Sequence, residues 1–149
     1  MKMSMTGARL PLWQKRAVTG AIVVAWLSGL ALFLTKTFGQ TQSEFGLQRH
    51  VLEIPLRAVH GGAMMIVLAA LGSVLAVHVP AGWESGLRRR SAFFTVAAVL
   101  VLAGTGWGLY YVGLESVRNA MGWVHAGIGL ALAPLFWIHS QRGKDLKKP

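Results

Sequence analysis

Apolar residues gather in four long runs, and short polar segments separate them. The runs predict membrane-spanning helices over about 17–35, 58–79, 91–112 and 121–138. Each is close to the roughly 20 helical residues that a bilayer's hydrocarbon core requires. The pattern therefore predicts an all-α fold, an integral membrane four-helix bundle. We expect residues 1–149 to form a single domain.

The composition agrees with a membrane protein. Hydrophobic residues make up 54% of the 149 residues, and charged residues only 13%. A water-soluble domain of this size cannot bury so much apolar surface. The net charge of +10 would suggest a nucleic-acid partner in a soluble protein. Here the basic residues lie outside the apolar runs, so we expect membrane lipid as the partner and no nucleic acid.

The basic residues also orient the bundle. Three segments that must share one side of the membrane hold Lys2, Arg9, Lys15, Arg16, then Arg88, Arg89, Arg90, then Arg142, Lys144, Lys147 and Lys148. The opposite side holds only Lys36, Arg49, Arg57 and Arg118. Because cytoplasmic loops carry the excess of Lys and Arg, both termini are predicted to be cytoplasmic. This charge pattern and the absence of cysteine suit a multi-pass protein of the bacterial inner membrane.

The first apolar run and the connecting segments also carry predictions. The first run is too long for a signal peptide and has no small-residue cleavage site after it, so we expect an uncleaved span. Residues 39–57 have a weak amphipathic pattern, which predicts a short helix on the outer surface. Residues 80–90 are expected to form a turn. Beyond a histidine pattern shared by two of the runs, no internal repeat stands out.

The histidines are the strongest functional signal. Of the five, four lie in or at the ends of the second and fourth runs: His60, His78, His125 and His139. Ionisable groups in membrane helices are costly, so they mark functional sites by default. Both helices run from the outside inwards, which places His60 and His125 near the outer surface and the other two near the cytoplasm. We predict one histidine pair at each level, whereas His50 lies in a loop and needs no function.

A facing pair of neutral imidazoles suits a six-coordinate haem iron between two helices. Two levels imply two b haems, held without covalent attachment because there is no cysteine. The spacing of 18 residues between His60 and His78 gives a rise of roughly 27 Å, whereas the 14 residues between His125 and His139 give roughly 21 Å. Zinc or copper at each pair is a rival interpretation, although neither cysteine nor an acidic cluster supplements the histidines. The structural alternative is that the imidazoles bond only to backbone or lipid headgroups.

Other residues suit a porphyrin without requiring one. Arg57 lies one turn from His60 and Arg118 two turns from His125, so either is a candidate partner for haem propionates. Positive-inside topology alone also accounts for single arginines. Glycines near the histidines would admit a flat, wide cofactor, although close helix packing uses small residues equally often.

The chain resembles the small bacterial four-helix di-haem b-type cytochromes, the cytochrome b-561 type of membrane electron carrier. The resemblance rests on 57–60 (Arg-Ala-Val-His), 76–78 (Ala-Val-His), 104–111 (Gly-Thr-Gly-Trp-Gly-Leu-Tyr-Tyr) and 123–139, which runs from Trp-Val-His to Trp-Ile-His. It covers roughly residues 52–143. It implies haem b with two histidine ligands and electron transfer across the membrane. The implied partners are quinol, a cytochrome or another oxidoreductase subunit.

Two functional classes remain open at this point. One is a redox protein, either an electron carrier or the membrane subunit of a larger oxidoreductase, with no residue doing acid–base catalysis. The other is a structural or assembly subunit of a membrane complex. An ion conduit is disfavoured because the predicted helices hold almost no acidic residues near the midplane. The sequence leaves the oligomeric state undetermined.

Overall fold

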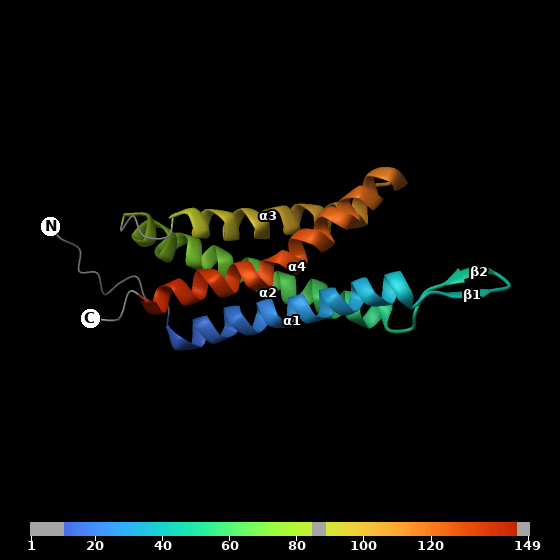
Figure 1. Cartoon of the computed structure of the whole chain (residues 1–149), viewed down its shortest axis with the longest axis horizontal. Helices are drawn as coiled ribbons and strands as arrows, with labels where there is room; N and C mark the ends of the chain where they lie inside the picture. The colour runs from blue at the N-terminus through green and yellow to red at the C-terminus, as the bar shows by residue number, and fades with distance from the viewer. Residues whose placement is uncertain (1–10, 85–88, 146–149) are drawn as a thin grey trace.

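The computed structural model describes residues 11–84 and 89–145, without the side chains of 76–84, 91 and 139–145. Within this range the chain forms helices α1 (Leu12–Phe38), α2 (Glu53–Glu84), α3 (Arg89–Tyr111) and α4 (Glu115–Asp145). They run alternately up and down, so that α1 begins where α4 ends (Figure 1). All four are long and apolar enough to cross a membrane. The expected all-helical bundle is confirmed, and these spans are those of a multi-pass membrane protein.

Three of the four helices, α1, α2 and α4, extend beyond their predicted apolar runs at both ends. The helices α2 and α4 begin at Glu53 and Glu115, several residues before the apolar runs at 58 and 121. The apolar pattern detects only the part that hydrocarbon would surround, whereas the polar end turns are helical too. A glutamate in the first turn favours this extension because the helix N-terminus carries partial positive charge. The predicted turn at 80–90 is shorter, since α2 reaches Glu84 and α3 starts at Arg89; residues 85–88 lie outside the description.

The prediction of a surface helix within 39–57 is wrong. Strands β1 (Thr41–Ser43) and β2 (Gly46–Gln48) pair there as an antiparallel hairpin that projects beyond the helix ends (Figure 1). Gly46 has a φ of 97°, a conformation that favours glycine and reverses the chain after Phe45. The Ser43 hydroxyl donates to the Gly46 carbonyl at 2.9 Å and further fixes the turn. The few apolar residues here are too widely spaced to decide the local structure.

The bundle is built from two helical hairpins. The helix α1 packs along α2 and α3 along α4, while α1 also touches α4, and α2 and α3 touch least. The apolar core where the hairpins meet contains Ala21, Ile22, Val67, Val99, Leu102 and Leu132. Many large apolar side chains point outwards, as lipid-facing positions would. The four helices therefore surround a narrow common interior.

A hydrogen bond at an exposed position joins α1 to α4. Pro134 lies inside α4 and has no N–H, so the carbonyl of Leu130 loses its usual helical donor. The indole Nε1–H of Trp26 donates to that carbonyl at 3.4 Å. In hydrocarbon, where water cannot replace a missing donor, such a bond favours this placement of the two helices.

Candidate functional site

The structure brings His60 of α2 and His125 of α4 together inside the bundle. Their ring centroids are 6.0 Å apart and the ring planes cross at 81°. Both side chains are half-buried. The two helices lie diagonally across the bundle, so the space between them is bordered by α1 and α3, which support one ring each.

The ring of His60 is held by α1. Its Nδ1 lies 2.8 Å from the carbonyl oxygen of Ala25 and 3.2 Å from the hydroxyl of Ser28. A carbonyl only accepts, so Nδ1 must carry the proton and donate it. A neutral imidazole then has its lone pair on Nε2, which is the form that ligates a metal.

The ring of His125 is held in the same manner by α3. Its Nδ1 lies 2.9 Å from the hydroxyl of Thr105. The Thr105 hydroxyl donates its own proton within α3, with the carbonyl of Val101 at 2.7 Å and that of Leu102 at 3.2 Å. Its oxygen therefore accepts from Nδ1–H, and His125 also keeps its lone pair on Nε2.

A glycine next to each hydroxyl lets the ring approach. A Cβ on Gly29 would lie 2.9 Å from Cε1 of His60, and one on Gly106 would lie 3.4 Å from Cε1 of His125. Real Cβ atoms essentially never come within 3.0 Å of another heavy atom, so α1 admits His60 only because residue 29 lacks a side chain. Each imidazole thus sits in a cradle of one hydroxyl and one glycine on a neighbouring helix, and His60 has the Ala25 carbonyl in addition.

The two cradles reveal an internal repeat, contrary to the sequence-based expectation. Ser-Gly at 28–29 corresponds to Thr-Gly at 105–106, a shift of 77 positions, and Val-His at 59–60 corresponds to Val-His at 124–125, a shift of 65. The core repeats with the same shifts, since Ile22 matches Val99 and Val67 matches Leu132. The shifts differ because the first hairpin has the longer connection, which contains β1 and β2. Two similar hairpins running in the same direction are related by an approximate two-fold axis along the bundle.

The second predicted pair, His78 and His139, does not follow this repeat. His78 lies on α2 and His139 on α4, and both side chains are outside the description. A shift of 65 would match His78 with position 143, which is four residues from His139. Four residues correspond to about 6 Å along a helix. The equivalence of His60 and His125 therefore does not extend to His78 and His139.

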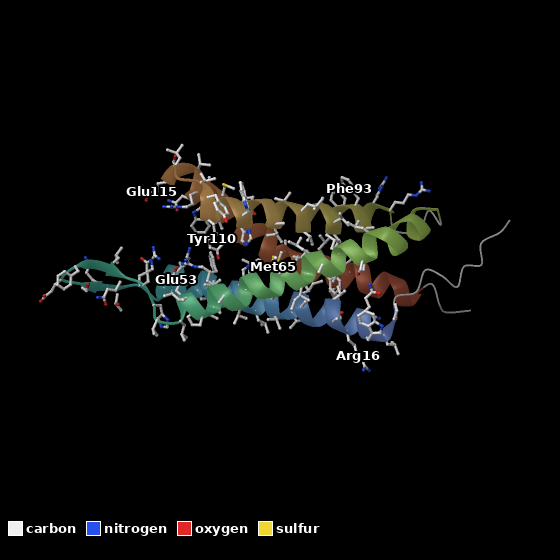
Figure 2. The ribbon with its side chains drawn as sticks, turned by 180° about the vertical axis from the view of Figure 1, so that it is seen from behind. Arg16, Glu53, Met65, Phe93, Tyr110 and Glu115 are labelled. Carbon is white, nitrogen blue, oxygen red and sulfur yellow. The ribbon has the colours of Figure 1, made fainter. Side chains whose placement is uncertain are left out.

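Arg57 and Arg118 lie in the first turns of α2 and α4. These helices begin at Glu53 and Glu115, which lie at the same end of the bundle (Figure 2). Arg57 forms a salt bridge with Glu53, whose side chain is buried, and Arg57 itself is about one third exposed. Arg118 is exposed on the first turns of α4. His50 lies outside the bundle, and its Nδ1 accepts a hydrogen bond from the Leu52 N–H at 3.2 Å, which agrees with a local role.

The missed residues, Ser28 and Thr105 with their glycines, carried one sequence signal. A small hydroxyl residue followed by glycine occurs in each helix that precedes a Val-His pair, at 28–29 and at 105–106, although α1 has a second such pair at 19–20. A spaced comparison of the two halves would have found it. The difference in connection length hides the correspondence from any single fixed repeat period.

The donor set distinguishes among metal groups. No three His, Cys, Asp or Glu side chains cluster among those that the structure describes, whereas a structural zinc ion takes four protein ligands. A haem brings four equatorial nitrogens of its own and asks the protein for two axial ones. The described chain offers two such imidazoles. Family models, curated proteins and solved structures give no significant match to the chain, so its residues and their geometry carry the assignment.

Proposed function

We propose that this protein is a membrane-embedded b-type cytochrome that holds haem non-covalently and carries electrons across the membrane. The observation that supports it is the His60–His125 pair: two imidazoles with centroids 6.0 Å apart and ring planes that cross at 81°, both with Nδ1 hydrogen-bonded. A metal–imidazole bond is about 2.0 Å long, so two imidazoles on opposite sides of one ion have centroids about 6 Å apart.

Each part of the chain has a defined task in this proposal. A bound haem supplies one-electron redox chemistry. His60 and His125 would hold the haem iron through their Nε2 atoms, and the cradles of α1 and α3 fix the tautomers and orientation of the two rings. The surrounding apolar helices keep water away from the site. Arg118 is available to a haem propionate at the outer end. Arg57 is available too, although it also forms a salt bridge with Glu53.

The fuller proposal contains a second haem between His78 and His139 near the cytoplasmic side. With both termini in the cytoplasm of a bacterium, the two haems would connect the outer and inner surfaces of the inner membrane. The connections between the described helices are short, and we propose that the chain works as the membrane subunit of a redox system. The partner would be a cytochrome or an oxidoreductase subunit, with quinone as a further candidate.

Haem content tests the proposal directly. The protein is purified in mild detergent from haem-supplied cells, and a dithionite-reduced minus oxidised spectrum is recorded with the ratio of haem to protein. A b-type signal at two haems per chain supports both sites, and one haem per chain supports the outer site alone. The absence of haem would overturn the proposal and favour a structural or assembly subunit.

Single variants then assign the ligands. His125→Ala and His60→Ala should each remove the outer haem, and His78→Ala and His139→Ala the inner one. His50→Ala is the matched control, since His50 bonds only locally, and should keep the full signal. If His125→Ala keeps both fold and spectrum, His125 is not a ligand.

A further inference from the structure

We propose that Ser28 and Thr105 are positioning residues that set the redox potential of the outer haem, with Thr105 the more important of the two. This inference rests on the proposed haem at His60 and His125. It concerns the chain's own hydroxyl groups, and it makes the two ligands chemically unequal even though the repeat places them alike.

Both hydroxyls are anchored before they meet a histidine. The Ser28 hydroxyl lies 2.7 Å from the Val24 carbonyl, and the Thr105 hydroxyl lies 2.7 Å from the Val101 carbonyl. Each hydroxyl proton is thereby committed within its own helix. The oxygen of each is left as a fixed acceptor that faces an imidazole Nδ1–H. A fixed acceptor restricts ring rotation more strongly than a freely turning hydroxyl or a water molecule would.

The two imidazoles depend on these oxygens to different extents. His60 has a backbone acceptor at 2.8 Å, the Ala25 carbonyl, and the Ser28 oxygen is the longer contact at 3.2 Å. For His125 the Thr105 oxygen is the close acceptor at 2.9 Å. The nearby Leu102 carbonyl also receives the Thr105 hydroxyl, at 3.2 Å. Removal of Ser28 therefore leaves His60 a good acceptor, whereas removal of Thr105 takes the main one from His125.

The consequence for the iron follows from ligand basicity. A hydrogen bond from Nδ1–H makes the opposite nitrogen a stronger donor, which favours the ferric state. Loss of the Thr105 oxygen should weaken that donation and raise the midpoint potential. Outer partners of metal-bound histidines change metal affinity by 10–100-fold. We expect a change of several-fold, up to about tenfold, in the one-electron reduction equilibrium, and tenfold corresponds to 59 mV.

The test compares Thr105→Val with a closely matched control. Thr35 of α1 bonds only to its own helix, with its hydroxyl at 2.9 Å from the Ala31 carbonyl and 3.1 Å from the Leu32 carbonyl. Thr35→Val therefore removes the same kind of intrahelical bond without touching a histidine. Midpoint potentials are measured by redox titration of the detergent-purified proteins, together with haem content and the low-spin electron paramagnetic resonance spectrum.

Thr105→Val should raise one midpoint potential and alter the low-spin spectrum, and Thr105→Ser should restore both. Ser28→Ala should produce a smaller shift, and Thr35→Val none. Equal potentials in Thr105→Val and Thr35→Val would overturn the inference while leaving the haem proposal intact. A wild-type protein without haem would instead overturn the proposed function. Should Thr105→Val fail to fold, Thr105→Ala removes the same oxygen without the added methyl group and is judged by the same criteria.

Discussion

The contact between Gly29 and the ring of His60 predicts how a substitution at Gly29 changes the stability of the protein. A Cβ at position 29 would lie 2.9 Å from Cε1 and 3.2 Å from Nδ1 of His60. Carbon atoms prefer separations of about 3.5–4.0 Å, so Gly29→Ala would create an overlap of about 0.6–1.1 Å. The ring of His60 cannot move away from α1 freely, because its Nδ1 is hydrogen-bonded to the carbonyl of Ala25, which lies on α1 as Gly29 does. The substitution must therefore either separate α1 from α2 or break that hydrogen bond.

The magnitude follows from two opposing terms. Overpacking of this kind costs about 1–3 kcal/mol, and replacing a helical glycine by alanine recovers about 0.5–1 kcal/mol. We expect Gly29→Ala to destabilise the protein by about 1–2 kcal/mol. Gly106→Ala, with its Cβ at 3.4 Å from His125, should be close to neutral. At Gly104 no atom lies within 4 Å of a Cβ, so Gly104→Ala should be neutral or slightly stabilising.

Thermal unfolding followed by circular dichroism in detergent is the assay. A loss of 1 kcal/mol lowers the Tm of a protein of about this size by roughly 2–4 °C. The expected order of Tm is Gly104→Ala highest, then Gly106→Ala, then Gly29→Ala. This order does not depend on haem, because it tests only the packing of His60 against α1. A Tm for Gly29→Ala equal to that of Gly104→Ala would refute the close approach.

Three further predictions concern the frame around the site. Trp26→Phe should destabilise the bundle by about 1 kcal/mol in a denaturant titration, since the Leu130 carbonyl loses its donor; an unchanged midpoint would contradict that bond. Glu53→Gln should cost about 1–3 kcal/mol by leaving Arg57 without its buried counter-charge. Glu115→Gln, at the equivalent first position of α4 but exposed, should cost far less, and equal losses would count against the ion pair. Replacing the β1–β2 hairpin by a short polar linker should leave helicity and the haem spectrum unchanged, because the hairpin projects away from the helices (Figure 1). A lost spectrum would show that it supports the site.

The number and type of the helices could be predicted from the apolar runs of the sequence. Four apolar runs of about 20 residues leave few alternatives to four long helices, because each backbone polar group in hydrocarbon must be satisfied within its own segment. The choice of His60 and His125 also came from sequence, since both occupy the early turns of helices that run in the same direction. The hairpin at 41–48 was missed because its structure depends on one glycine at a positive φ, which hydrophobic periodicity does not report.

Only the tertiary structure decided which groups accept a hydrogen bond from each histidine. Ser28 is 32 residues from His60, and Thr105 is 20 residues from His125. Contacts at such separations depend on how the two helices of each hairpin are aligned, and the sequence pattern of one helix does not specify that alignment. The same alignment exposes the internal repeat and shows that His78 and His139 lie outside it. The sequence by itself determined the helices and the residue types available for a metal. Helix packing determined the tautomers of His60 and His125, because the fixed acceptors lie on neighbouring helices.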